Sequence, residues 1–156
     1  NGIGFTGGSQ CFPLAAADYY NVIIGYQTYS GGNSVSIGYR ASASRNSISV
    51  GFEAGQYWDN VADEAAYNTF IGFEAGRGDV SGAAVGNYNI AIGTQAFYLA
   101  GYNGGDPLLP PTGAERNVCI GQEAGRYLRS NSNIAIGHYA LRNYKQTHYA
   151  NKLMSV

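Results

Sequence analysis

The sequence is poor in charge. Among 156 residues there are 9 Lys and Arg and 10 Asp and Glu, so charged residues make up 12 % and the formal net charge is −1. Soluble globular domains carry roughly 25 % charged residues. A near-neutral chain without clustered basic residues lacks the positive surface that nucleic acids and anionic membranes attract. We therefore expect neither a nucleic acid nor a membrane as partner.

Cysteine and long apolar runs are also scarce. Cys11 and Cys119 are the two cysteines, and their spacing gives neither a zinc-ligand pattern nor a disulfide framework, which leaves open whether they pair. The longest apolar runs, such as Val22–Ile24 and Leu14–Ala17, are too short to span a bilayer. Residues 1–20 contain no Lys or Arg and so lack the basic start of a signal peptide. The first residue is Asn, which suggests a processed chain or a piece of a longer one.

Glycine and aromatic residues, by contrast, are abundant. The chain has 23 Gly, 14 Tyr and 6 Phe, and 45 % of its residues are hydrophobic. Disordered segments are poor in aromatic residues and rich in charge, so this composition predicts a folded chain with a buried core.

One short phrase recurs seven times. Its eight positions are Asn or Ser, an apolar residue or Thr, any residue, Ile or Val, Gly, two free residues, and Ala or Thr. The copies begin at Asn21, Ser34, Ser47, Asn68, Asn89, Asn117 and Asn133. The phrase glycines are spaced by 13, 13, 21, 21, 28 and 16 residues, so a minimal unit of 13 residues carries insertions of varying length. This pattern is typical of a repeat scaffold with loops. Ile3-Gly4-Phe5 reads as a truncated eighth copy.

Within the phrase, apolar residues alternate with period two, which is typical of a strand. Val22 and Ile24 share one face and Ile23 takes the other, after which Gly25 lets the chain turn. The small residue at the eighth position predicts a narrow interior and a second short strand facing the first. We therefore predict an all-β repeat fold, a β-roll or solenoid with loop insertions. A rival fold, the hexapeptide β-helix of acyltransferases, needs an aliphatic residue about every six positions, and residues 37–48 do not supply it.

The repeats divide the chain into three parts. We expect an N-terminal cap or truncated repeat over residues 1–20, a seven-repeat β-roll over 21–141, and a C-terminal tail or connection to a following segment over 142–156. Asparagines open most of the phrases, and we expect their side chains to form a structural hydrogen-bonded ladder along the stack.

A repeat unit this small buries its apolar face only by stacking. We expect the roll interior to hold small residues and the opposite, apolar face, including Ile23 and Phe70, to lack cover. An exposed apolar stripe marks an interface. The sequence thus predicts a homo-oligomer packed along the roll axis, with three chains favoured, although its arithmetic does not separate three chains from two.

Two stretches of the repeat resemble known families. Residues 34–55, SVSIGYRASASRNSISVGFEAG, resemble the head repeat of trimeric autotransporter adhesins, and residues 68–76 (NTFIGFEAG) and 89–97 (NIAIGTQAF) resemble repeats of bacteriophage tail fibres and related virion fibre proteins. The resemblance covers about residues 21–141 and implies a left-handed parallel β-roll packed as a homotrimer. It also implies an extracellular structural protein, either a segment of a virion fibre (phage tail or head fibre) or a bacterial adhesin head. The insertions, and the absence of a visible stalk or membrane anchor, favour the virion fibre.

Partner recognition is expected in the inserted loops, residues 55–67, 76–88 and 97–116. Aromatic side chains on such loops offer flat contact surfaces for a host-surface glycan or protein, or for other virion proteins. The same rings could instead fold back over the roll or fill clefts between chains. Arg77-Gly78-Asp79 spells the integrin-binding tripeptide, although it also reads as an ordinary turn. The candidate residues are Tyr57, Trp58, Arg77, Asp79, Tyr98 and Tyr102.

The sequence gives little support for catalysis. Glu53, Glu74 and Glu123 could be the acids of a glycan-cleaving tailspike, the least favoured alternative, but they share one repeat register and so indicate a scaffold feature. That register is mostly polar, and we expect it to point outward. His138 and His148 fit neither a catalytic triad nor a metal-ligand spacing. We predict no enzyme activity, no catalytic or metal-binding residue and no cofactor.

Overall fold

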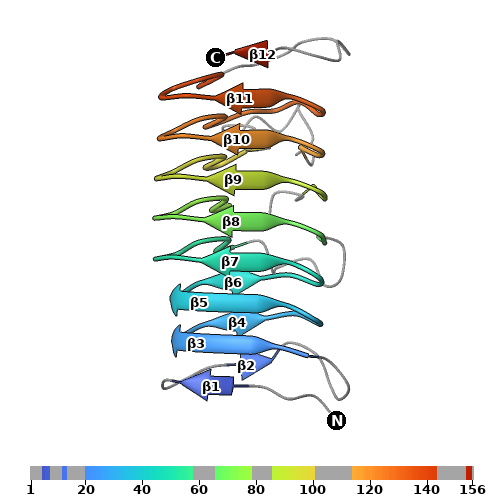
Figure 1. Cartoon of the computed structure of the whole chain (residues 1–156), viewed down its shortest axis with the longest axis vertical. Coiled ribbons are helices and arrows are strands. Elements are labelled where there is room, and N and C mark those ends of the chain that lie inside the picture. The colour runs from blue at the N-terminus through green and yellow to red at the C-terminus, as the bar shows by residue number, and fades with distance from the viewer. Residues whose placement is uncertain are drawn as a thin grey trace, which may run out of the picture.

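The structure, a computed structural model, describes residues 5–7, 12–13, 20–57, 66–78, 86–100, 114–143 and 154–155. In this part of the chain the fold is all-β, with no helix. The strands lie one above another in chain order (Figure 1). We call each phrase, together with the residues up to the next phrase, a rung.

Parallel strands form two sheets. The larger sheet has nine strands in the order of the sequence. These are β1 (Phe5–Gly7), β3 (Val22–Tyr26), β5 (Val35–Tyr39), β7 (Ile48–Val50), β8 (Thr69–Ile71), β9 (Ile90–Ile92), β10 (Val118–Ile120), β11 (Ile134–Ile136) and β12 (Met154–Ser155). The smaller sheet has three strands, β2 (Phe12–Pro13), β4 (Tyr29–Ser30) and β6 (Ser42–Ala43).

The seven phrases pair in register. Val22 lies opposite Val35 in the neighbouring strand, and Thr69 lies opposite Ile90 in spite of the insertion between their rungs. The insertions begin and end outside the strands, so they leave the pairing unchanged. Each phrase position therefore forms a column along the stack.

The interior contains the third and eighth phrase positions. Thr28, Ala41 and their equivalents at the eighth position are buried, as predicted. The expectation that Ile23 and Phe70 lie on an uncovered face is wrong, because both are only 2 % exposed. The third position points inward with the small residues, and the second and fourth positions point outward. The exposed apolar face is therefore built from the β-branched residues on either side of each inward residue.

The N-terminal copy of the phrase is shifted from its expected place. A copy at Ile3-Gly4-Phe5 would align Phe5 with the residue after the phrase glycine. Instead Phe5 pairs with Val22 and Gly7 with Ile24, so β1 has a different register. Strand β2 has the same offset, since Phe12 pairs with Tyr29. At the other end β12 pairs with β11 and continues the sheet beyond residue 141.

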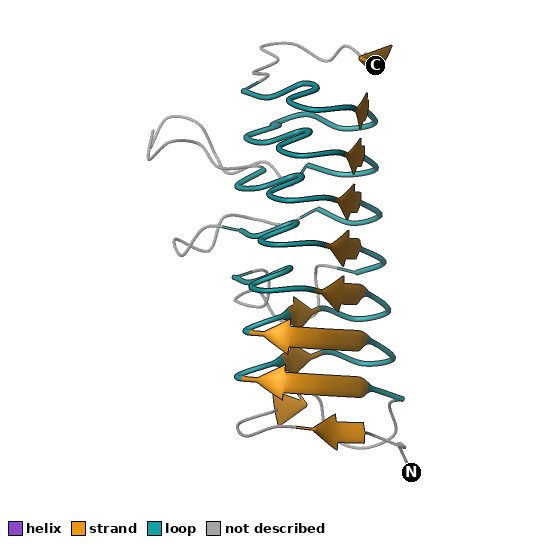
Figure 2. Cartoon of the chain, turned by 60° about the vertical axis from the view of Figure 1, so that its left-hand side comes forward, coloured by secondary structure: helices purple, strands orange, loops and turns teal. Residues whose placement is uncertain are grey.

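Two strands per rung are found only near the N-terminus. Within the described ranges the second strand occurs as β2, β4 and β6, and from Gly51 onward tight turns replace it (Figure 2). In three later rungs the position equivalent to Ser42 of β6 is a glycine with positive φ, at Gly55, Gly76 and Gly125. A positive φ is incompatible with a strand, so the chain turns there instead.

The predicted asparagine ladder is confirmed. The Asn89 N–H donates to Asn68 Oδ1 at 2.9 Å, the Asn117 N–H donates to Asn89 Oδ1 at 3.0 Å, and the Asn133 N–H donates to Asn117 Oδ1 at 2.9 Å. In two lower rungs Ser34 and Ser47 replace Asn. The ladder supplies acceptors to buried backbone N–H groups at the start of the strands.

Removal of one ladder side chain tests this role. We expect Asn89→Ala to reduce the free energy of unfolding by about 2–3 kcal/mol, because the buried N–H of Asn117 loses its acceptor. Asn89→Ser is the matched control and should lose less, since serine fills the same column at Ser47, whose hydroxyl accepts from the Asn68 N–H at 3.0 Å. Urea unfolding measures the free energy of unfolding of both variants. If both variants lose the same free energy of unfolding, the hydrogen bond from the Asn117 N–H to the side chain of residue 89 is not the stabilising interaction.

Candidate interaction surface

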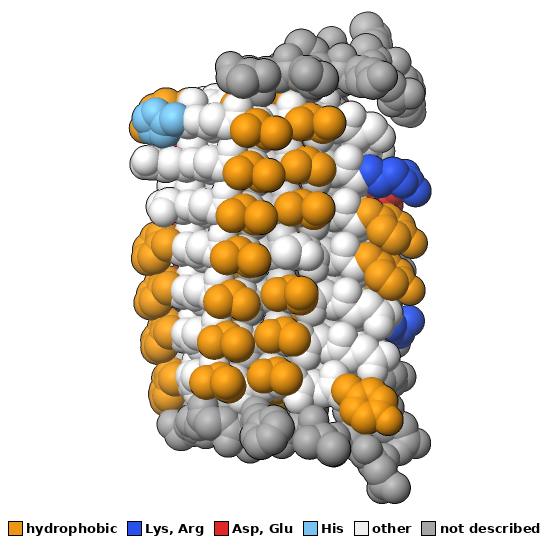
Figure 3. Space-filling view, viewed as in Figure 1, with side chains coloured by type: hydrophobic (Ala, Val, Ile, Leu, Met, Phe, Trp, Pro, Cys, Tyr) orange, Lys and Arg blue, Asp and Glu red, His pale blue; other side chains and the backbone are white. Residues whose placement is uncertain are grey.

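One face of the stack is apolar along the seven phrases. The second and fourth phrase positions form two columns of Val and Ile, interrupted by Thr69 (Figure 3). The most exposed members are 36–44 % exposed, and they are Ile24, Ile48, Ile71, Ile90, Ile92, Ile134 and Ile136. We call these two columns the apolar face.

An aromatic column borders the apolar face. Tyr26, Tyr39, Phe52 and Phe73 occupy the sixth phrase position in successive rungs, with neighbouring ring centroids 5.6, 5.0 and 5.1 Å apart and the rings nearly parallel. They form the orange column at the left edge of Figure 3. In the later rungs Thr94, Gln122 and His138 take this position. The exposed apolar surface is therefore widest over the first four phrases.

This surface is suited to binding a protein. It contains no Lys, Arg, Asp or Glu at the second, fourth or sixth phrase position, and the outward fourth position is Ile or Val in every phrase. Contiguous exposed apolar surface of this kind is rare on monomeric proteins and normally marks a contact with another molecule. The sequence does hold the signal for this face, because Ile or Val recurs at the outward fourth position, whereas the inward third position varies in size.

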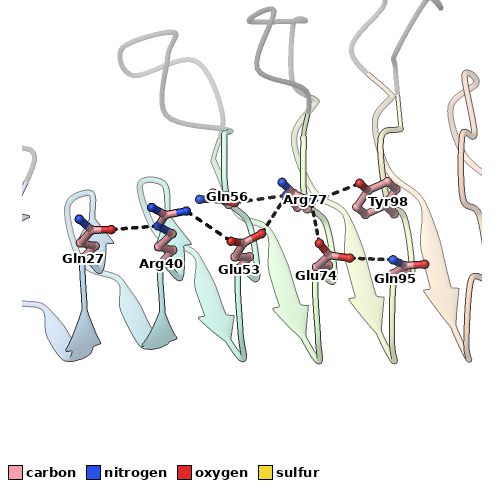
Figure 4. Close-up of polar contacts among 8 residues, drawn as sticks. All are labelled: Gln27, Arg40, Glu53, Gln56, Glu74, Arg77, Gln95 and Tyr98. Atoms are coloured by element: carbon pink, nitrogen blue, oxygen red, sulfur yellow. Dashed lines mark hydrogen bonds and ion pairs between the residues drawn. The ribbon is translucent and has the colours of Figure 1, made fainter.

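The three glutamates form part of a polar ladder on another side of the stack. Arg77 Nε lies 3.2 Å from Glu53 Oε2, Arg77 Nη1 lies 2.6 Å from Glu74 Oε1, and Gln95 Nε2 donates to Glu74 Oε2 at 2.7 Å (Figure 4). Glu123 pairs in the same way with Arg126 and Arg142.

The three glutamates depart from the expectation that this register points outward, whereas Tyr139 in the same register is exposed. Glu53, Glu74 and Glu123 are only 8–9 % exposed, because residues of neighbouring rungs lie against them. Each of the three carboxylates has at least one arginine partner, so the arrangement is that of a scaffold.

Three of the predicted partner-binding residues come together beside this ladder. Tyr57, Arg77 and Tyr98 alternate along the stack, with the Arg77 guanidinium carbon 5.3 Å from the Tyr57 ring centroid and 5.7 Å from that of Tyr98. Arg126 continues the series, at 5.0 Å from the Tyr98 ring and 4.9 Å from the Tyr127 ring. This Tyr–Arg ladder lies at the bases of the insertions.

Arg77 is held firmly in this position. Burial by itself lowers the pKa of its guanidinium. The hydrogen bond with Tyr57 and the nearby Tyr98, Glu53 and Glu74 together raise the pKa by more than burial lowers it, so the pKa lies above its ordinary value. The Arg77 side chain is 22 % exposed and bonded within the stack. Its tripeptide partner Asp79 lies outside the described residues, as do Trp58 and Tyr102, so their predicted roles remain predictions.

The remaining candidate groups form no site that the structure describes. His138 stacks on Tyr139 with ring centroids 3.7 Å apart. Across the described ranges no three His, Cys, Asp or Glu side chains are grouped to hold a metal ion. None of the described residues belongs to a helix long and apolar enough to cross a membrane. Cys11 and His148 lie outside the described part.

Comparison with known proteins adds no relative. No family model, no curated protein and no solved structure matches this chain.

The Arg77 ion pairs should contribute to stability. Arg77→Gln leaves Glu53 and Glu74 without their shared cation, and we expect a loss of about 1–3 kcal/mol, below the range for a fully buried pair because Arg77 is partly exposed. Arg116→Gln is the matched control, since the Arg116–Glu115 pair is largely exposed and should contribute less than about 1 kcal/mol. Urea unfolding of both variants distinguishes them, and a loss at Arg77 no larger than that at Arg116 would refute a structural role for the ladder.

Cys119 provides a probe of the interior. The residue is fully buried, and burial raises the pKa of its thiol to about 12. In a Cys11→Ser variant at about pH 8 we expect Cys119 to resist thiol-modifying reagents until denaturant unfolds the chain. Rapid labelling of the folded protein would contradict this burial.

The same thiol makes stability depend on pH. Its folded pKa lies above the unfolded value of 9.0, so its contribution is complete below about pH 9 and is lost as the pH rises toward about 12. The difference in stability between the parent and Cys119→Ala should therefore narrow as the pH is raised from about 8 to 11. A difference that is constant over this range would contradict the raised pKa.

Proposed function

We propose that the chain is a structural segment of a virion fibre, of the phage tail or head fibre kind. In this proposal it forms a left-handed parallel β-roll, three copies pack as a homotrimer, and the inserted loops are presented for attachment to a host-surface glycan or protein. The observation that carries the proposal is the apolar face, which runs along every described phrase and needs a covering partner.

A second copy of the chain is the partner that best suits this face. Its columns repeat with the spacing of the rungs, so only a partner with the same repeat can meet them along their full length. An identical copy has this repeat, and the absence of charge on the two columns removes any like-charge repulsion between copies. A fibre built in this way is rigid and near-neutral, and it needs no cofactor.

The positions of the insertions support the display of loops. In the sequence the insertions follow Tyr57, Gly78 and Ala100, beyond the second and fourth phrase positions, so they do not interrupt the pairing of the residues that form the apolar face. Their starting points lie one rung apart, since the Gly78 N–H donates to the Gln56 carbonyl and the Leu99 N–H donates to the Arg77 carbonyl. Loops with stacked bases can form one shared recognition surface while the other face assembles.

A bacterial trimeric surface adhesin head is the alternative. It would use the same face and the same loops. The two differ in the segments joined to this one, which would be a membrane-anchoring β-barrel in the adhesin and an attachment region for the virion in the fibre. The full-length gene distinguishes them. The tailspike-like hydrolase has less support, since the three carboxylates it would need are paired with arginines.

The first test is the solution mass by light scattering at several protein concentrations. We expect a stable trimer, and we expect the double variant Ile71→Lys, Ile92→Lys to dissociate because it places charge in the middle of the apolar face. Arg129→Glu is the control. It changes the net charge by the same number of units, with opposite sign, at a position away from the apolar face where other rungs carry insertions. A parent chain that stays monomeric would overturn the proposal.

A second measurement covers the case in which the double variant does not fold. The unfolding midpoint of an assembled protein rises with protein concentration, because association stabilises only the folded state. We expect the midpoint of the unchanged chain to rise over a hundredfold range of concentration. A midpoint independent of concentration would argue against assembly.

A further inference from the structure

The stack has two different interiors. In rungs 20–50 the interior is lined mainly by hydroxyl groups and small residues, and Ile23 is its only large apolar side chain among those described. The buried hydroxyl residues are Thr28, Ser30, Ser34, Ser36, Ser42, Ser47 and Ser49. No Ser or Thr is buried among the described residues of the later rungs, from 66 to 143.

The later rungs have an apolar core. One cluster of buried residues runs from Ala54 to Ala140, and Phe70, Phe97, Cys119 and Leu128 are its larger members. Burial of such apolar side chains stabilises the folded state. The interior of the later rungs therefore contributes more hydrophobic stabilisation than the interior of the early rungs.

The hydroxyl-lined interior is not fully hydrogen-bonded. Thr28 Oγ1 donates to the Gly38 carbonyl and Ser49 Oγ to the Ser42 carbonyl, both at 2.6 Å. The buried Oγ atoms of Ser36 and Ser42, however, have no partner, and in the later rungs the same holds for Arg126 Nε and Asn133 Oδ1. A buried polar group without a partner destabilises the folded state.

The aromatic column lies outside this interior and adds contacts between neighbouring rungs. Its first two rings, Tyr26 and Tyr39, belong to rungs with the hydroxyl-lined interior. Phe52 belongs to the rung in which the apolar core begins at Ala54, and the column ends one rung later at Phe73. Stacked rings attract one another, so the column joins adjacent rungs through contacts that remain partly exposed. The early rungs are thus joined by this outer column and by the second sheet through β4 and β6. The later rungs are joined by their apolar core, by the Tyr67–Tyr88 stack and by the Tyr–Arg ladder.

We infer that residues 20–50 form a separate opening unit, stabilised by the aromatic column, which can unfold locally while residues 66–143 stay folded. Repeat stacks permit this, because each rung contacts mainly its neighbours and regions of low stability open independently. Except for Tyr57, the Tyr–Arg ladder belongs to the stable part, as do the bases of the insertions that begin after Gly78 and Ala100, so these contacts persist when residues 20–50 unfold. The inference does not depend on the proposed function, since the apolar face covers both parts alike.

Hydrogen exchange of the whole chain, followed by mass spectrometry, tests the inference. We expect peptides from 20–50 to exchange roughly tenfold or more faster than peptides from 114–143, once intrinsic rates are corrected. Tyr39→Ser removes a ring that stacks on both sides and should accelerate exchange in 20–50 without changing 114–143. Tyr88→Ser is the matched control, because Tyr88 is an exposed ring stacked on Tyr67 in a rung with the apolar core, and it should change 20–50 little.

A variant that stabilises residues 20–50 distinguishes a local effect from unfolding of the whole chain. The double variant Ser36→Ala, Ser42→Ala removes the two unpaired hydroxyls at nearly constant volume and should slow exchange in 20–50 several-fold, while leaving 114–143 unchanged. Equal exchange rates along the stack, or faster exchange in 114–143, would overturn the inference. So would an equal response of both parts to Tyr39→Ser. None of these outcomes bears on whether the chain forms a trimer.

Discussion

In-register pairing of parallel strands is the constraint on which the rest of this structure depends. Because each phrase lies directly over the preceding one, every side chain meets the residue at the same position one strand spacing away. The phrase glycines show how close the approach is, since a Cβ added to Gly38 would lie 2.1 Å from the carbonyl oxygen of Gly51. Any residue with a side chain would separate the rungs at this point. The repeat is thus a requirement of the stacking and not only a record of duplication.

Columns of equal residues stabilise some side chains and would destabilise others. An amide stacks well on an amide, because its oxygen accepts from the next rung, as in the ladder from Asn68 to Asn133. Aromatic rings also stack on their own kind, as Tyr39 and Phe52 do. Carboxylates repel one another, and Glu53 and Glu74 are tolerated in adjacent rungs because Arg77 binds both. Polar and aromatic ladders therefore follow from the same geometry.

The insertions and the apolar face are compatible because they use different parts of the rung. Each insertion lies between the tight turn and the next phrase, so it changes neither the strand register nor the two outward apolar columns. The apolar core of the later rungs replaces the second sheet that these rungs lack, with Phe97 and Leu128 filling the space inside the turns. A loop-bearing part and a regular part thus share one continuous face.

The sequence alone determined the repeat, the first strand of each phrase, the small residues of the interior and the asparagine ladder, because each follows from local alternation and from identical spacing. Among the described residues, the predicted second strand is present only in the early rungs. It left the direction of the faces open. Whether Ile23 or Ile24 points inward depends on which side the chain closes, and that is decided by the turn after the phrase glycine. The pairing of Arg77 with Glu53 and the alternation of Tyr57, Arg77 and Tyr98 were also hidden, since they join residues from rungs separated by insertions of unequal length. Only the stacked structure brings such residues together, because contact there depends on rung position and not on distance along the chain.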